Sequence, residues 1–216
     1  MTRERERADL VRDLEDRGIT DERVLAAMLR VPREAFVPAD LTDHAYDDGP
    51  LPIGDGQTIS QPFVVALMAE AGGIAPDARV LEVGTGSGYG AAVLAELARE
   101  VHTIERIAWL AHAADERLAA LGYTNVRVHV GDGSLGWPPS SPYDAILVAA
   151  GGPSVPLALV SELAIGGALV IPVGNGRMQR LLRVTRTGDS FIRDDLGAVH
   201  FVPLIGMEAW DGEARR

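Results

Sequence analysis

A strand-like segment that runs into a glycine-rich turn constrains the fold more than any other feature of the chain. Residues 80–88 read VLEVGTGSG, and the apolar run at 91–97 that follows has the length and composition of a helix. Glycine allows positive φ and close approach of a ligand, and the start of a helix presents unpaired N–H groups. The junction therefore predicts a strand–turn–helix unit that binds a ligand. A glycine-rich turn without a ligand is the alternative interpretation.

The spacing of this turn also indicates which ligand it suits. A dinucleotide fingerprint requires a third glycine at position 89, where this chain has Tyr89. The chain instead has the spacing G-x-G-x-G after Glu82, an acidic residue in the strand, and this is the spacing of S-adenosylmethionine sites. Glu105 ends the next predicted strand, where a carboxylate can accept both hydroxyls of a ribose. Asp132 follows a third strand and is expected to reach an adenine amino group.

Composition excludes several classes of function. All twenty basic residues are arginine, so a Walker A loop and a pyridoxal Schiff base cannot form, and the absence of cysteine removes disulfides and thiolate nucleophiles. The net charge of −11 argues against a nucleic-acid partner. No metal site is expected, because no H-E-x-x-H motif or tight histidine cluster occurs. With neither an apolar leader nor a membrane-length apolar run, we expect a cytoplasmic protein that does not bind a membrane.

Apolar patterning predicts a doubly wound α/β sheet, Rossmann-like, with a small N-terminal helical lobe. Residues 1–75 are expected to form helices and a substrate loop, and residues 76–216 the Rossmann-like core with C-terminal edge strands, all within one structural domain. Helices are predicted at 3–17, 88–98, 107–121 and 155–164. A further helix is predicted to begin after an N-cap at Thr20 and to end at Pro32. Strands are predicted at 79–83, 101–105, 126–130, 145–149, 168–172, 180–187 and 198–204. Residues 36–57, rich in Pro, Gly and Asp, are expected to be an irregular loop.

Ser60 stands immediately before Gln61-Pro62 and an apolar helical run. From the residues alone, this serine is typical of a helix N-cap. A capped helix N-terminus also attracts carboxylates, so the pattern is compatible with an acceptor site.

Read together, the motifs resemble those of the protein-L-isoaspartate (D-aspartate) O-methyltransferase family. The resemblance extends from about Val24 to Leu204 and rests on motifs in the family's order. These are AYDD at 45–48, GQTISQP at 56–62, VLEVGTGSGY at 80–89, IERI at 104–107, GDGSLGWP at 131–138, PYDAILV at 142–148, GGALVIPVG at 166–174 and FVPLIG at 201–206.

The resemblance implies methyl transfer from S-adenosyl-L-methionine to the carboxylate of L-isoaspartyl residues in damaged proteins, leaving S-adenosyl-L-homocysteine. The ester then collapses to a succinimide, which allows repair. No general base is required, because a carboxylate is already ionised at neutral pH. The resemblance implies Ser60 as the catalytic serine and Val202, Pro203 and Leu204 as part of the peptide wall. It implies cofactor contacts from Thr58, Ile59, Glu82, Gly84, Gly86, Ser87, Glu105, Arg106, Asp132 and Gly133.

Alternatives remain at this point. Relatives of the family install a succinimide at one aspartate of a ribosomally made peptide, and their cofactor half would look the same. A cofactor-binding module without catalysis is disfavoured by Ser60 and Glu105, and a nicotinamide oxidoreductase by Tyr89. Partners are expected to be isoaspartyl- or aspartyl-containing peptides and proteins, with a monomer favoured. The chain departs from the family at Asp55, at Gly90 and at the loop 151–153, which is expected to be flexible.

Overall fold

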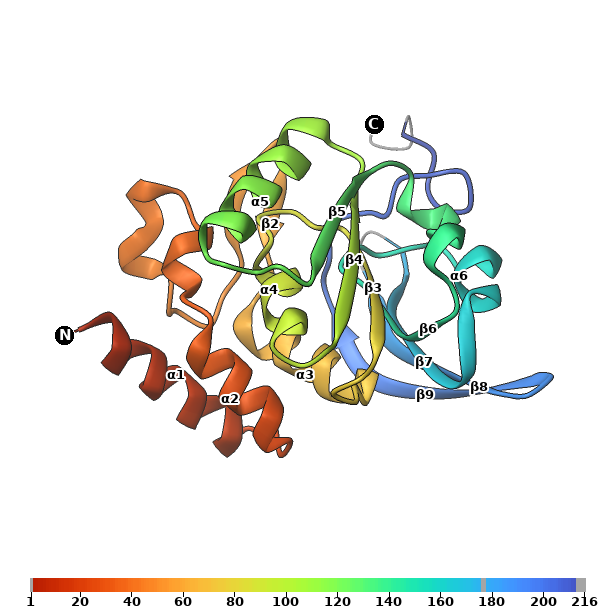
Figure 1. Ribbon diagram of the computed structural model, residues 1–216, viewed down its shortest axis with the longest axis horizontal. Helices are drawn as coiled ribbons and strands as arrows, with labels where there is room; N and C mark the ends of the chain where they lie inside the picture. The colour runs from red at the N-terminus through yellow and green to blue at the C-terminus, as the bar shows by residue number, and fades with distance from the viewer. Residues whose placement is uncertain (1, 176–177, 213–216) are drawn as a thin grey trace.

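A seven-stranded β-sheet forms the centre of the protein in the computed structural model, which describes residues 2–175 and 178–212 (Figure 1). The strand order is β5-β4-β3-β6-β7-β8-β9. The neighbours from β5 to β7 pair in parallel, whereas β8 pairs antiparallel with both β7 and β9. The strands are β3 (Arg79–Val83), β4 (Glu100–Glu105), β5 (Val126–Val130), β6 (Tyr143–Val148), β7 (Leu163–Gly174), β8 (Gln179–Thr187) and β9 (Ser190–Val199). The predicted Rossmann-like sheet with C-terminal edge strands is confirmed.

Helices cover both faces of this sheet and bury two apolar clusters. Successive strand residues point to opposite faces, so Val80 joins one cluster and Leu81 the other. The first cluster includes side chains from α1 to α4, so the N-terminal helices share their core with the sheet. The second includes Leu159 and Val160 of α6. The helices are α1 (Arg3–Asp16), α2 (Glu22–Arg30), α3 (Pro62–Gly72), α4 (Tyr89–Ala95), α5 (Ala108–Ala120) and α6 (Leu157–Ser161).

The strand order places a switch point between β3 and β6. The chain moves outward from β3 through β4 to β5, then returns to the other side of β3 as β6. In open parallel sheets, ligands bind beyond the carboxyl ends of the strands at such a point. The glycine turn after β3 lies there. None of the helices in the described part of the chain has the length and apolar character needed to cross a membrane.

Two N-terminal predictions need correction. The N-cap of α2 is Asp21 and not Thr20, since the Asp21 carboxylate accepts hydrogen bonds from the backbone N–H groups of Arg23 and Val24. Thr20 instead donates its N–H and its hydroxyl to Glu70. Either residue type can cap a helix, so composition alone could not choose between them.

The stretch at 36–57 is not irregular throughout. It contains one 3₁₀ helix, η2 (Ala39–His44), and the last residue of another, η1 (Arg33–Phe36). It also contains most of a β-hairpin, formed by β1 (Leu51–Gly54) and β2 (Gln57–Ile59). The hairpin turn at Asp55-Gly56 has positive φ at both residues, 48° and 68°. Strands this short show no clear alternation of apolar and polar residues, which is why the pattern did not predict them.

The last predicted strand, at 198–204, is also wrong. The edge strand β9 spans Ser190–Val199 and follows directly on the Gly188-Asp189 turn. Its side chains are largely exposed and include three adjacent charges at 193–195, as is common on unpaired sheet edges. Residues 201–205 leave the sheet and reach the ligand edge. The predicted helix at 155–164 is shorter, because Leu163 begins β7.

Candidate active site

A pocket lies beside the switch point, at the carboxyl ends of β3, β4 and β6. Its wall is largely apolar, with the glycine turn and two acids on one side and residues 57–60 on another. The structure brings all but one of the predicted site residues to this wall. They are Thr58, Ile59, Ser60, Glu82, Gly84, Gly86, Ser87, Glu105, Arg106, Gly133, Val202, Pro203 and Leu204.

The glycine turn after β3 depends on left-handed backbone. Gly84, Gly86 and Gly88 have φ of 94°, 52° and 92°, values that side chains other than glycine rarely adopt. The Gly84 N–H donates to the Ile104 carbonyl at 2.8 Å, which fixes the turn against the end of β4. Gly88 is the N-cap of α4 and has no capping side chain. The turn therefore presents backbone, rather than side chains, to the pocket.

Glu105 ends β4 and holds the glycine turn through its carboxylate. One oxygen accepts the Gly86 N–H at 3.0 Å, and the other accepts the Ile107 N–H at 3.0 Å. A carboxylate oxygen can accept two hydrogen bonds, so each keeps an acceptor site for a further donor. Because Glu105 also lines the pocket, it can present two acceptors to a vicinal diol.

Glu82 is a buried carboxyl at the end of β3. It accepts the Thr103 hydroxyl at 2.6 Å, and Thr103 is in turn bonded to Thr85 at 2.6 Å. Burial, together with the nearby charge of Glu105, raises the pKa of Glu82 to about 8. A Cβ at Gly90 would lie 2.2 Å from a Glu82 oxygen. Glycine at position 90 thus leaves room for the carboxyl group of Glu82.

This pKa predicts how stability depends on pH. Between the ordinary value of 4.5 and about 8, the folded protein holds a proton on Glu82 that the unfolded chain releases. The contribution of this group to stability is therefore present below that window and falls as pH rises through it, by up to about 1.4 kcal/mol per pH unit. We expect Glu82→Gln to flatten the decline in unfolding free energy between pH 5 and 8, as measured by urea denaturation.

Asp195 provides the control for this measurement. The hydrogen bond from Arg180 holds the pKa of Asp195 below its usual range, so this exposed group titrates outside the window. Asp195→Asn should therefore keep the wild-type slope. Parallel slopes for Glu82→Gln and the wild type would contradict the assignment of a proton to Glu82.

Ser60 follows the hairpin directly and lies at the pocket wall. The N-cap of α3 is Gln61, so the capping role that its sequence position suggested for Ser60 is not observed. The Ser60 hydroxyl forms no hydrogen bond with the residues that the structure describes. At the hairpin tip, Trp109 of α5 donates its indole N–H to Asp55 at 2.5 Å. The tip is thereby fixed to the helix that follows Glu105.

The C-terminal segment closes another side of the pocket. Gly151 donates to the Val202 carbonyl at 2.8 Å and accepts from the Leu204 N–H at 2.9 Å. The Trp210 indole donates to the same Gly151 carbonyl at 3.0 Å. The Gln179 side chain exchanges two further hydrogen bonds with the backbone of Phe201. The loop at 151–153, expected to be flexible, is instead held on several sides.

Asp132 is the predicted site residue that does not line the pocket. One of its carboxylate oxygens accepts the N–H and the hydroxyl of Ser134, and the other accepts the Met207 N–H at 2.7 Å. It therefore ties the 3₁₀ helix η3 (Gly133–Leu135) to the C-terminal segment. The neighbouring Gly133 does line the pocket.

Sequence reasoning missed Tyr89, Trp109 and Arg33. In the sequence Tyr89 stands out only as the residue that replaces a third glycine, yet its buried ring forms part of the pocket wall. Its position in the first turn after the glycines was the available signal. Nothing in the sequence distinguishes Arg33, which is completely buried, from the many surface arginines.

Comparisons with known proteins agree with this geometry. The sequence profile of the Protein-L-isoaspartate(D-aspartate) O-methyltransferase family matches residues 5–209. A protein-L-isoaspartate O-methyltransferase 1 of Rhodopseudomonas palustris strain HaA2 is 61% identical over 196 residues, which are 90% of this chain and 80% of the relative. A protein-L-isoaspartate O-methyltransferase 2 of Marinobacter nauticus is 58% identical, with 90% of each chain covered.

Solved structures show the same relationship. A protein-L-isoaspartate O-methyltransferase superposes with a TM-score of 0.85 at 30% identity, over 94% of this chain and 67% of the other. A Plasmodium falciparum structure described as a protein-L-isoaspartate O-methyltransferase was solved in complex with S-adenosyl-L-homocysteine. It superposes with a TM-score of 0.81 at 28% identity, over 92% of this chain and 98% of the other.

Proposed function

The chain belongs to the protein-L-isoaspartate(D-aspartate) O-methyltransferase family, and on that premise we propose that it methylates the carboxylate of L-isoaspartyl residues in damaged proteins. The observation that carries the proposal is the Ser60 hydroxyl, which has no hydrogen-bond partner among the described residues and shares one pocket with the glycine turn and Glu105. A hydroxyl without an intramolecular partner can donate to an acceptor carboxylate. The same pocket offers a nucleoside site next to it.

The residues present fit S-adenosyl-L-methionine. The two Glu105 oxygens each retain an acceptor site for a ribose hydroxyl, and the turn at Gly84 and Gly86 presents backbone without side chains. Apolar side chains such as Leu94 and Leu147 suit the adenine and thioether parts. The cofactor supplies an electrophilic methyl group on a positively charged sulfur.

The protein's own contribution to the reaction is alignment and exclusion of water. The acceptor carboxylate is already ionised at neutral pH, so no residue has to remove a proton. Ser60 would donate its hydroxyl hydrogen to one carboxylate oxygen and aim the other at the methyl group. Val202, Pro203 and Leu204 would hold the peptide on either side of the reacting residue. Methylation turns the carboxylate oxygen into part of a good leaving group, so the ester closes to a succinimide and releases methanol.

The closest competing function is the tailoring of one ribosomally made peptide at a normal aspartate. It would use the same cofactor pocket, so the distinction depends on the acceptor. The relatives at 54–61% identity, which match about nine-tenths of this chain, carry the name protein-L-isoaspartate O-methyltransferase. Their names support repair as the activity of this chain as well.

Methyl transfer from labelled cofactor to matched peptides tests the proposal. We expect L-isoaspartyl versions of several unrelated sequences to be methylated with similar kcat/KM, and normal aspartyl versions to react at least about 100-fold more slowly. A repair enzyme must accept many sequences, whereas recognition of particular side chains discriminates by orders of magnitude. D-aspartyl versions complete each set. Efficient methylation of one aspartyl peptide, with generic isoaspartyl peptides inert, would replace repair by tailoring.

A further inference from the structure

Arg33 forms an unusual buried contact behind the pocket. Its side chain is 0% exposed, and its guanidinium donates to three backbone carbonyls. These are Ala45 at 2.7 Å, Gly49 at 3.2 Å and Ser60 at 2.9 Å. The three acceptors are spread along the segment 45–60, so one side chain connects both ends and the interior of the stretch that leads to the pocket.

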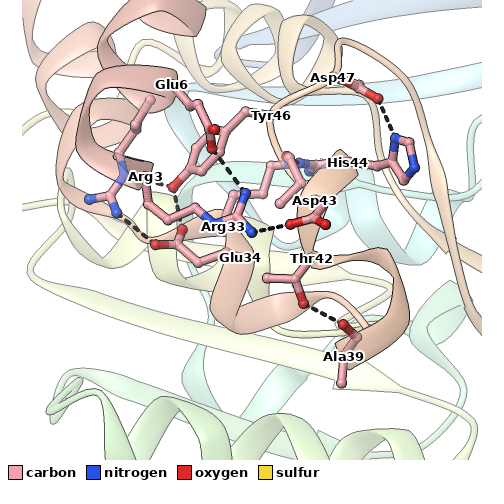
Figure 2. Close-up of polar contacts among 12 residues, drawn as sticks. Arg3, Glu6, Arg33, Glu34, Ala39, Thr42, Asp43, His44, Tyr46 and Asp47 are labelled. Atoms are coloured by element: carbon pink, nitrogen blue, oxygen red, sulfur yellow. Dashed lines mark hydrogen bonds and ion pairs between the residues drawn. The ribbon is translucent and has the colours of Figure 1, made fainter. Parts of the chain in front are cut away.

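Arg33 has no carboxylate partner among the described residues. The adjacent Glu34 pairs instead with Arg7 and accepts the Tyr46 hydroxyl, as Figure 2 shows for Tyr46. Asp48 pairs with Arg17. Burial lowers the pKa of the Arg33 guanidinium. Asp48 attracts the guanidinium only from beyond ion-pair distance. Burial of a cation without a direct ion pair is unfavourable, so its hydrogen bonds must account for its presence.

The requirement for arginine follows from the number of donors. Three carbonyls in different directions can be satisfied by the five N–H groups of a planar guanidinium, whereas lysine has one nitrogen and glutamine two amide hydrogens. The guanidinium also lies 5.0 Å from the centre of the Tyr89 ring, which forms part of the pocket wall. Arg33 thus contacts two neighbouring parts of that wall, the backbone of Ser60 and the ring of Tyr89.

We propose that Arg33 is a positioning residue for the acceptor half of the site, which fixes the backbone of Ser60 so that its hydroxyl points at the substrate carboxylate. The proposal rests on the proposed function, because Ser60 is its point of action. Arg33 does not line the pocket, so it touches neither substrate nor cofactor there. The cofactor half, centred on Glu105 and the glycine turn, receives no hydrogen bond from Arg33.

Arg23 provides a matched control, because it is another arginine that joins carbonyls of separate segments. It donates to Ile74 at 2.5 Å and to Leu97 at 2.6 Å, and it does not line the pocket. A merely structural arginine clamp should therefore behave like Arg23. Arg33→Met, Arg33→Lys and Arg23→Met are compared with the wild type, each at a temperature well below its own melting point.

Three measurements follow. We expect both Arg33 variants to lower kcat for an isoaspartyl peptide by roughly tenfold or more, as for lost hydrogen bonds from a charged donor. Lysine should not restore it, since one nitrogen cannot reach three carbonyls. Calorimetric affinity for S-adenosyl-L-homocysteine should change by less than about threefold, as expected if the cofactor contacts stay intact. In the absence of cofactor and peptide, hydrogen exchange of the backbone amides at 57–60 should be faster in both Arg33 variants than in the wild type. It should not be faster in Arg23→Met.

A double-mutant comparison separates action through Ser60 from other effects. In a Ser60→Ala background, Arg33→Lys should lower kcat by less than about twofold, because interacting residues are not additive. A full additive loss, or a kcat loss in Arg23→Met equal to that of Arg33→Lys, would overturn the proposal. If the wild type itself fails to methylate isoaspartyl peptides, the proposed function fails instead. In that case, unchanged amide exchange at 57–60 would still refute the positioning role of Arg33. If Arg33→Met does not fold, Arg33→Lys is used for every comparison.

Discussion

We expect Ser60→Ala to lower kcat for methylation of an isoaspartyl peptide by about 10- to 100-fold, the usual effect of removing one hydrogen bond to a charged group. Affinity for S-adenosyl-L-homocysteine should stay within about threefold of the wild type, because the lost contact is to the acceptor and not to the cofactor. Initial rates and titration calorimetry on the same preparation measure both quantities. Loss of kcat with retained cofactor affinity would identify Ser60 as a residue of the acceptor half.

Thermal melts distinguish this role from a structural one. If Ser60 capped α3, its removal would lower stability by about 1 kcal/mol, and the folded enzyme would keep its turnover. Since Gln61 is the N-cap and the Ser60 hydroxyl has no partner among the described residues, we expect an almost unchanged melting temperature. Ser161→Ala, which removes a helix-end hydroxyl bonded to Ala158 and not part of the pocket wall, is the matched control. Wild-type kcat in Ser60→Ala would exclude the assignment.

The core of the fold could be predicted because its signals are local. The strands β3 and β4 are short, largely buried runs, and each is followed by a helix. The glycine turn and Glu105, which stand between strand and helix, mark the ligand edge. The three alternating glycines predicted a turn with positive φ, which the structure has at Gly84, Gly86 and Gly88. Because the turn follows a strand, it also predicted which end of the sheet faces the ligand. This is why the pocket contains nearly every residue inferred from the motifs.

What the sequence could not predict depends on contacts between distant segments. The hairpin at 51–59 is held by Asp55 and Trp109, which lie 54 positions apart, and neither residue signals the other. Asp132 was expected to face the ligand, but its carboxylate holds the backbone of Met207 and the side chain of Ser134. Arg33 carries no signal of burial in the sequence, because arginine is one of the residue types most often exposed. Its burial depends on a segment that folds back over it.

Glu105 carries the second large expected effect. We expect Glu105→Ala to weaken binding of S-adenosyl-L-homocysteine by about 10- to 150-fold, equivalent to about 1.5–3 kcal/mol for hydrogen bonds to a charged group. Two losses combine in this variant. The ribose hydroxyls lose their acceptors, and the N–H groups of Gly86 and Ile107 lose the carboxylate that holds the glycine turn against the end of β4.

Glu105→Gln makes the test sharper because it keeps the shape of the side chain. Each carboxylate oxygen accepts one backbone N–H, so an amide can satisfy only one of the two donors and must turn its NH₂ group toward the other. We therefore expect Glu105→Gln to weaken cofactor binding by at least about tenfold, a loss typical of one charged hydrogen bond. Glu100→Gln, on the same strand but paired with Arg79 at its opposite end, should bind like the wild type. Equal affinity of Glu105→Gln and Glu100→Gln, with both variants folded by thermal melting, would show that the cofactor does not depend on this carboxylate and would move the ribose site elsewhere in the pocket.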